Sequence, residues 1–87
     1  MNKKYQIVIL KTAQKEIKKL QTPTAEKIFT TIRTLATDPR PSGCKKLVAT
    51  KNSYRIRVGN FRILYTIEDQ IKIVEVSGVK HRREAYD

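Results

Sequence analysis

The sequence predicts an α+β domain in which an N-terminal strand and a helical hairpin pack on one face of an antiparallel β-sheet. Two observations favour this class. Apolar residues recur at helical spacing before residue 37, whereas the second half carries short runs rich in Val, Ile, Tyr and Phe. The 87 residues contain no repeat and no linker, so we expect one domain over residues 1–87.

Three elements are expected in the first half. Tyr5–Leu10 has the alternation of a strand, and Thr12 is predicted to cap a short helix that ends near Leu20. A second helix should begin at Thr22-Pro23, with Thr as N-cap and Pro as first helical residue, and stop at Asp38-Pro39. The short connection predicts an antiparallel helix pair. The inward positions are Ala13, Ile17, Leu20, Ala25, Ile28, Phe29, Ile32, Leu35 and Ala36.

The second half is predicted to form a meander of strands. Gly59-Asn60 suits a two-residue type II′ turn because Gly comes first, and residues 68–70 should form the next turn. Residues 79–87 are interpreted as a basic C-terminal tail with room for at most one helical turn. The expected strands are Lys45–Val48, Tyr54–Val58, Phe61–Ile67 and Ile71–Val76.

The turn at Gly59-Asn60 fixes the register of the central hairpin and therefore the face of each side chain. One face, toward the helices, should carry Tyr54, Ile56, Val58, Phe61, Ile63 and Tyr65. On the other face Arg57 falls opposite Arg62, with Arg55 beside them. Like charges directly opposite each other on a sheet cost roughly 0.2–1 kcal/mol per pair. An anion that bridges the guanidinium groups would offset this cost, and Arg is well shaped for two-pronged phosphate contacts. The alternative is an ordinary solvated basic face, on which Glu75 could also pair with an arginine.

The charge balance indicates a polyanionic partner. Nineteen Lys and Arg stand against eight Asp and Glu, a formal net charge of +11 that attracts nucleic acid, anionic membranes or acidic proteins. The first apolar run ends at Leu10, too short for a signal peptide or a membrane span, so we expect a cytoplasmic protein without a membrane partner. Cys44 has no second cysteine to pair with and is expected to be half-buried rather than nucleophilic.

The C-terminal tail supplies candidates for proton transfer. His81 is the only side chain there whose ordinary pKa lies near 7, so it is a candidate general acid or base, with a plain surface histidine as the alternative. Tyr86 could stack on a base or move a proton. The other candidate RNA-binding residues are the cations Lys45, Lys46, Lys80, Arg82 and Arg83.

No motif predicts a metal or a cofactor, because the sequence has no acidic cluster for Mg²⁺, no zinc spacing and no phosphate-binding glycine loop. A route without a metal would use the 2′-hydroxyl of RNA as internal nucleophile. Arg55, Arg57 and Arg62 would then stabilise the charge on the phosphorane. DNA lacks this hydroxyl, so the chemistry implies RNA.

Two segments, YRIRVGNFRILY at 54–65 and HRREAY at 81–86, resemble the signature of the RelE/ParE toxin superfamily, and the likeness extends over nearly the whole chain. The resemblance to the RelE branch implies a toxin that cleaves the messenger RNA codon in the ribosomal A site. Such cleavage leaves a 2′,3′-cyclic phosphate and a 5′-hydroxyl. The family's site residues would fall on Arg55, Arg57, Arg62, Tyr86 and either His81 or Arg82.

This sequence departs from the best-known RelE pattern by having Arg rather than Lys on the first hairpin strand. Arg is effectively always protonated, so His81 becomes the more plausible proton-transfer group. The resemblance implies a RelB-like antitoxin, with an acidic or partly disordered segment, as a partner beside the ribosome and messenger RNA. A ParE-like inhibitor of DNA gyrase and a non-enzymatic RNA-binding domain are the alternatives. The arginines and the tail bearing His and Tyr favour RelE over ParE.

Overall fold

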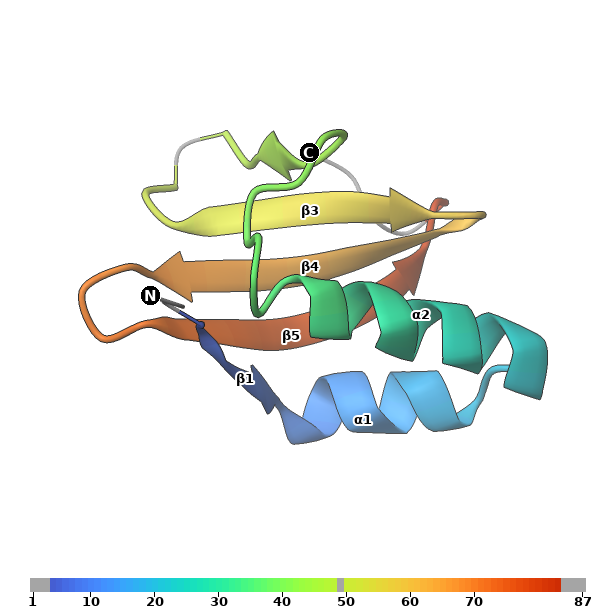
Figure 1. Cartoon of the computed structure of the whole chain (residues 1–87). Coiled ribbons are helices and arrows are strands. Elements are labelled where there is room, and N and C mark those ends of the chain that lie inside the picture. Colours follow the sequence, from blue (N-terminus) through green and yellow to red (C-terminus); the bar gives the residue numbers. More distant parts are fainter. Residues whose placement is uncertain (1–3, 49, 84–87) are drawn as a thin grey trace.

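The computed structural model describes residues 4–48 and 50–83, in which one strand precedes two helices and four further strands follow (Figure 1). This order and the mixed α+β class are as predicted. Tyr86 and the other residues of 84–87 lie outside the described part of the chain. The elements are β1 (Gln6–Ile9), α1 (Lys11–Lys18), α2 (Thr22–Thr34), β2 (Lys45–Lys46), β3 (Ser53–Val58), β4 (Phe61–Glu68) and β5 (Ile73–His81).

The strands form one five-stranded sheet in the order β1-β5-β4-β3-β2. Four strands form an antiparallel meander, but β1 joins its edge parallel to β5, from Gln6 opposite Ile73 to Ile9 opposite Val76. The sheet is therefore mixed rather than purely antiparallel. The alternation of residues in β1 predicts a strand, but it does not show with which strand β1 pairs or in which direction. The long connection from β1 to β5 through the helices and the meander permits a parallel pair.

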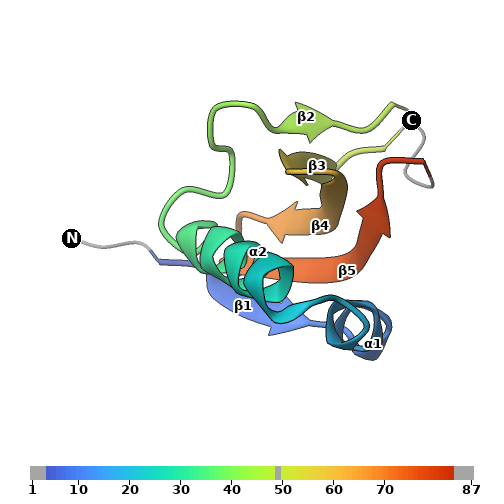
Figure 2. The same ribbon diagram turned by 90° about the vertical axis from the view of Figure 1, so that its right-hand side faces the viewer.

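The helices run in opposite directions, and α2 covers one face of the sheet while α1 lies beside β5 (Figures 1 and 2). The predicted caps are wrong by one or two residues. Leu10 and Gln21 occupy the N-cap positions, and neither side chain caps its helix. The chain passes from β1 through Leu10 directly into α1, so Thr12 already lies within the helix. No helix of the described residues is long and apolar enough to cross a membrane.

The β3–β4 hairpin has the predicted register, with Val58 opposite Phe61, Arg57 opposite Arg62 and Tyr54 opposite Tyr65. Gly59 has a φ of +59°, whereas Asn60 is not in the left-handed region, as a type II′ turn requires. The hairpin therefore positions the arginines as the sequence predicts.

The β4–β5 connection differs from the prediction. It spans residues 69–72, and Lys72 takes a left-handed φ of 56°, so Ile71 lies exposed in the turn rather than at the start of a strand. Strand β5 also continues through residues assigned to the tail, as far as His81. A bulge makes this extension possible, since Leu64 pairs with Gly78 but Tyr65 with Val76, which leaves Ser77 as an extra residue.

The core lies between α2, α1 and the inner face of β4 and β5. Most predicted inward positions of the helices are buried, but Phe29 is 40% exposed. On the sheet, Ile63 and Tyr65 are buried, and the other four predicted inner residues pack against the core while remaining partly exposed. The buried residues are Ala13, Ile17, Ile28, Ile32, Leu35, Ile63, Tyr65, Ile67, Val74, Val76 and Val79.

Candidate functional site

The three predicted arginines share the face of the sheet that points away from the core. Arg57 and Arg62 are direct partners across β3 and β4, and Arg55, opposite Leu64, lies one row further along the same face. Lys45 of β2 pairs with Arg55, so it joins this face from the edge strand. Four cations from three neighbouring strands therefore surround one area of the sheet, which we call the basic pocket.

The basic pocket has a volume of about 190 Å³ and is lined by Gly43, Lys45, Arg55, Arg57 and Arg62. Gly43 has a φ of +94°, a conformation that favours glycine, and its lack of a side chain leaves the wall of the pocket as bare backbone. Sequence reasoning missed Gly43 as a lining residue, because only the path of the chain before β2 brings it to the arginines.

Arg62 is the most constrained cation of the pocket. It is half-buried, and its Nη1 is shielded from solvent without a hydrogen-bond partner among the described residues. A buried guanidinium nitrogen without a partner is costly, and an anion that accepts its hydrogen bond would remove that cost. Arg57 is exposed, and its Nε donates to the carbonyl of Gly59 at 3.0 Å, which holds the side chain against the hairpin turn. Arg62 and Arg57 therefore place two guanidinium groups at the pocket, and a small shift of the Arg62 side chain would bring its Nη1 to an anion bound there.

The connection from α2 to β2 runs over the same face of the sheet as α2 (Figure 1), and side chains on this face, opposite to the arginine face, anchor it. The buried hydroxyl of Tyr65 donates to the carbonyl of Pro39 at 2.8 Å. Arg40 makes two hydrogen bonds to Asp69, at 2.8 and 3.2 Å, and its Nε donates to the hydroxyl of Tyr54 at 3.1 Å. These contacts tie the connection to β3, β4 and the β4–β5 turn.

Asp69 also accepts a hydrogen bond from the hydroxyl of Tyr5 at 2.6 Å. The hydrogen bonds from Arg40 and then Tyr5 lower the pKa of Asp69 to about 2, and those to Asp69 and Tyr54 raise the pKa of Arg40 above its usual range. Asp69 is thus ionised at neutral pH, when the anchor is complete. Sequence reasoning missed this anchor, because Arg40 and Asp69 lie 29 residues apart in the chain and no local pattern joins them.

Two predicted RNA-binding lysines do not line the pocket. Lys46 pairs with Tyr54 and so has the register of the opposite face. Lys80 is opposite Arg62, on the arginine face, but its Nζ is ion-paired with Glu16 of α1. Glu16 was not singled out from the sequence. Glu75 has the register of Thr66, on the arginine face as expected, and no ion pair of Glu75 occurs within the described residues.

The tail residues are divided between the two faces. His81 is opposite Phe61, whose side chain lies on the inner face, and the two rings meet edge to face with centroids 5.3 Å apart. The backbone N–H of Arg83 donates to Nδ1 of His81 at 3.3 Å, so the neutral ring carries its proton on Nε2. Arg82 and Arg83 are exposed. By register, His81 therefore lies in the row next to that of Arg57 and Arg62, and its side chain points to the opposite face of the sheet.

Cys44 is half-buried, as expected, and lies beside Tyr65. Burial first, and then the neighbouring Cys44, raise the pKa of the Tyr65 hydroxyl above its usual range. Within residues 4–48 and 50–83, no three His, Cys, Asp or Glu side chains gather into a metal-binding group.

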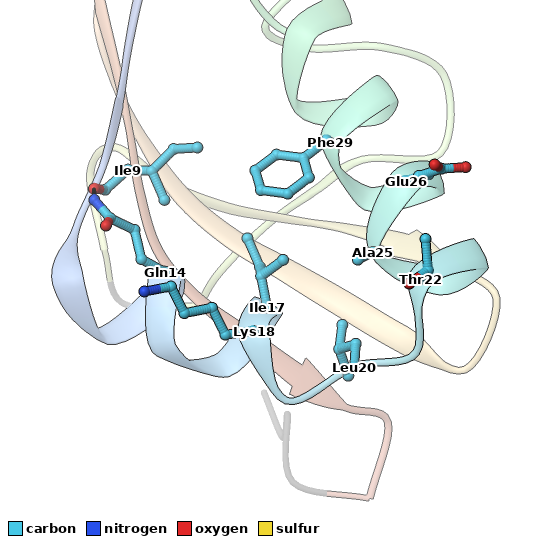
Figure 3. A pocket seen from close by; sticks show the side chains of 9 residues that line it. All are labelled: Ile9, Gln14, Ile17, Lys18, Leu20, Thr22, Ala25, Glu26 and Phe29. Atoms are coloured by element: carbon cyan, nitrogen blue, oxygen red, sulfur yellow. Dashed lines mark hydrogen bonds between the residues drawn. The ribbon is translucent and has the colours of Figure 1, made fainter.

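A second surface feature is an apolar groove of about 550 Å³ between the two helices. Figure 3 shows Ile9, Ile17 and Phe29 directed into this groove from β1, α1 and α2. Lys18 and Glu26 lie at its rim. The groove and the basic pocket are formed by different parts of the fold, so two ligands could bind without competing for the same side chains.

Comparisons with known proteins give a consistent family. Residues 7–86 match the family model described as the ParE toxin of the type II toxin–antitoxin system parDE. The protein of Methanocaldococcus jannaschii described as "Putative toxin RelE1" is 30% identical over 86 residues, which cover 95% of this chain and 96% of that protein.

Solved structures show the same fold. The archaeal RelE–RelB complex from Pyrococcus horikoshii contains a chain with a TM-score of 0.83 and 24% identity, covering 98% of this chain and all of that one. A chain of the RelBE2 toxin–antitoxin complex from Mycobacterium tuberculosis has a TM-score of 0.80 and 25% identity, covering 91% of this chain and 99% of that one.

Proposed function

Because this chain belongs to the RelE/ParE superfamily of type II toxin–antitoxin toxins, we propose that it is an endoribonuclease that cleaves messenger RNA in the ribosomal A site. The observation that carries the proposal is the basic pocket, in which the buried Nη1 of Arg62 lacks a hydrogen-bond partner among the described residues. A phosphate in this pocket would supply the missing acceptor and relieve the repulsion between Arg57 and Arg62.

In the proposed reaction the 2′-oxygen of the nucleotide forms a bond to phosphorus while the bond to the 5′-oxygen breaks. The 2′-hydroxyl gives up its proton and the departing 5′-oxygen gains one, which leaves a 2′,3′-cyclic phosphate and a 5′-hydroxyl. Arg55, Arg57 and Arg62 would orient the phosphate and stabilise the charge on the phosphorane. They cannot accept the proton, because a guanidinium stays protonated.

We propose His81 and Tyr86 for the proton transfers; to reach the phosphate, the His81 ring would have to turn from Phe61 toward the arginine face. To protonate the 5′-oxygen, His81 would act as an imidazolium that donates from Nε2, because the N–H of a neutral imidazole is too weak an acid. The ring would then give up the hydrogen bond that Nδ1 accepts from the N–H of Arg83. His81→Gln should therefore slow cleavage while RNA affinity is retained. Unchanged cleavage in this variant would remove His81 from the mechanism, and Tyr86→Phe tests the second residue in the same assay.

The deciding experiment adds purified protein to ribosomes stalled on a defined messenger RNA and maps the new 5′ ends by primer extension. We expect cuts at the A-site codon with the native protein and none with Arg62→Ala. Arg33→Ala, which removes an exposed arginine of α2, is the matched control and should cut like the native protein. The absence of cuts with folded native protein would contradict the nuclease proposal.

The second candidate function is inhibition of DNA gyrase, favoured by the match to the ParE family model. A gyrase poison needs no phosphate-cleaving site, so it would not use the Arg62 nitrogen that lacks a hydrogen-bond partner among the described residues. A supercoiling assay with the same three proteins separates the two functions. Inhibition of gyrase by the native protein and by Arg62→Ala alike, without RNA cleavage, would establish the second candidate.

We further propose that the chain is neutralised by a RelB-type antitoxin, as the solved complexes of its relatives suggest. The apolar groove between the helices suits the apolar side of an amphipathic helix, which the exposed Phe29 would contact. Lysines are frequent on α1, at 11, 15 and 18, so acidic residues on the partner would complement it.

A further inference from the structure

The joint between α1 and the end of β5 lies next to the basic pocket, and the proposed nuclease site does not use it. One carboxylate oxygen of Glu16 accepts the N–H of Val79 at 2.8 Å, and the other is ion-paired with Nζ of Lys80. The pairing of β1 with β5 ends at Val76. Glu16 therefore supplies an acceptor at a place where, within residues 4–48 and 50–83, β5 has no neighbouring strand on that side.

Gly78 allows this joint to form. A Cβ atom at this position would lie 3.4 Å from Oε1 of Glu16 and 3.5 Å from Cε of Lys80. The side chains of the ion pair thus pass directly over the glycine. The Glu16 side chain is 21% exposed and that of Lys80 35% exposed, so the pair is shielded from much of the solvent that would otherwise weaken it.

Lys80 belongs by register to the same row as two arginines of the pocket. Arg57, Arg62 and Lys80 are successive partners across β3, β4 and β5. Residues directly opposite each other share a face, with Cβ atoms about 4.5–5.5 Å apart. Lys80 therefore starts from a position where its side chain could extend toward a phosphate beside Arg62, but the ion pair directs it to α1.

We propose that Glu16 is a positioning residue of the RNA site, which holds Lys80 against α1 so that RNA contacts the pocket cations but not Lys80. The inference rests on the proposed function. For Lys80 to contact a phosphate, its ion pair with Glu16 would have to break. The partly buried carboxylate of Glu16 would then lose its positively charged partner. Glu16 thus determines how many cationic side chains contact the RNA. It also holds the end of β5 through the N–H of Val79.

The test is the salt dependence of binding to a 2′-O-methyl RNA oligonucleotide, which cannot be cleaved by 2′-hydroxyl attack. Glu16→Gln keeps an oxygen for the N–H of Val79 but removes the ion pair that directs Lys80 to α1. The slope of log Kd against log salt concentration should steepen by about 0.7, the value for one more phosphate contact on a single strand. Glu26→Gln, an exposed carboxylate of α2, is the matched control because it changes the net charge equally but frees no lysine, and its slope should stay native.

The double variant Glu16→Gln/Lys80→Met has the net charge of the native protein and should recover the native slope. If the slope of the double variant is instead lower than the native slope by about 0.7, Lys80 already contacts RNA in the native protein, and the role proposed for Glu16 is wrong. An unchanged slope in Glu16→Gln also contradicts it. If the native protein binds no RNA, or binds with the same slope after Arg62→Ala, the proposed function itself fails and the inference fails with it.

A measurement on the native protein does not depend on the folding of any variant. Lysines are acetylated with an N-hydroxysuccinimide ester, with and without the same RNA, and the modified positions are quantified by mass spectrometry. RNA should protect Lys45, which lines the pocket, and leave the reactivity of Lys80 unchanged. Equal protection of both lysines would overturn the proposal.

Discussion

The hydroxyl of Tyr65 provides a sharp test of how the fold supports the basic pocket. Tyr65 is 1% exposed and donates to the carbonyl of Pro39, itself buried, at 2.8 Å. Tyr65→Phe removes one oxygen and keeps the aromatic ring, so the packing of the core is preserved. The loss is then confined to one buried hydrogen bond and to the carbonyl that it leaves without this donor.

A buried acceptor left unsatisfied costs about 1–3 kcal/mol. For a domain of this size, 1 kcal/mol lowers Tm by roughly 4–8 °C. Tyr65→Phe should therefore lower Tm by at least about 4 °C and shift the urea midpoint, with an unchanged m-value because the folded state stays compact. Circular dichroism at neutral pH measures both quantities.

Tyr54→Phe is the matched control. The Tyr54 and Tyr65 rings are stacked as direct partners on β3 and β4, with centroids 6.0 Å apart, but the Tyr54 hydroxyl bonds to the exposed Arg40. Its removal should change the free energy of unfolding by no more than about 0.5 kcal/mol. Equal losses in the two variants, or a Tyr65→Phe protein as stable as the native one, would refute the assignment of Tyr65 as the buried anchor of this connection.

Three further predictions concern stability. Asp69 has its pKa lowered to about 2 in the folded state from 3.8, so its contribution is complete above about pH 4 and disappears as the pH falls toward 2. The difference in urea midpoint between native protein and Asp69→Asn should shrink over that interval, and a constant difference would contradict it. Ile32→Ala, at a site 2% exposed, should lower the free energy of unfolding measured in urea by about 2–5 kcal/mol. Phe29→Ala, at a site 40% exposed, should lower it clearly less. Equal losses in the two variants would count against the assigned core. Gly59→Ala meets no atom within 4 Å but must adopt a φ of +59°, so thermal unfolding should show a loss of about 1–2 kcal/mol, smaller for Gly59→Asn.

The sequence predicted the central hairpin most accurately, because a two-residue turn fixes every partner in the two strands that it joins. The faces of Arg55, Arg57 and Arg62 followed directly, and so did the inner positions of Ile63 and Tyr65. Contacts between distant segments were not predictable in this way. The parallel pairing of β1 with β5 and the ion pair in which Lys80 donates to Glu16 join residues more than 60 positions apart, and no local periodicity encodes them.

The site residues after the bulge show why the tail was misplaced. If Ser77 paired with Leu64 and no bulge formed, the register that starts from Tyr65 and Val76 would place Gly78 opposite Ile63 and Val79 opposite Arg62. The bulge moves Val79 to the inner face, where it is 4% exposed in the core, and brings Lys80 opposite Arg62.

The same shift turns His81 toward Phe61 and away from the arginines. Burial of Val79 therefore decides which cation of the tail faces the basic pocket. That cation is a lysine in a row with two arginines, and its ion pair with Glu16 limits the repulsion among them.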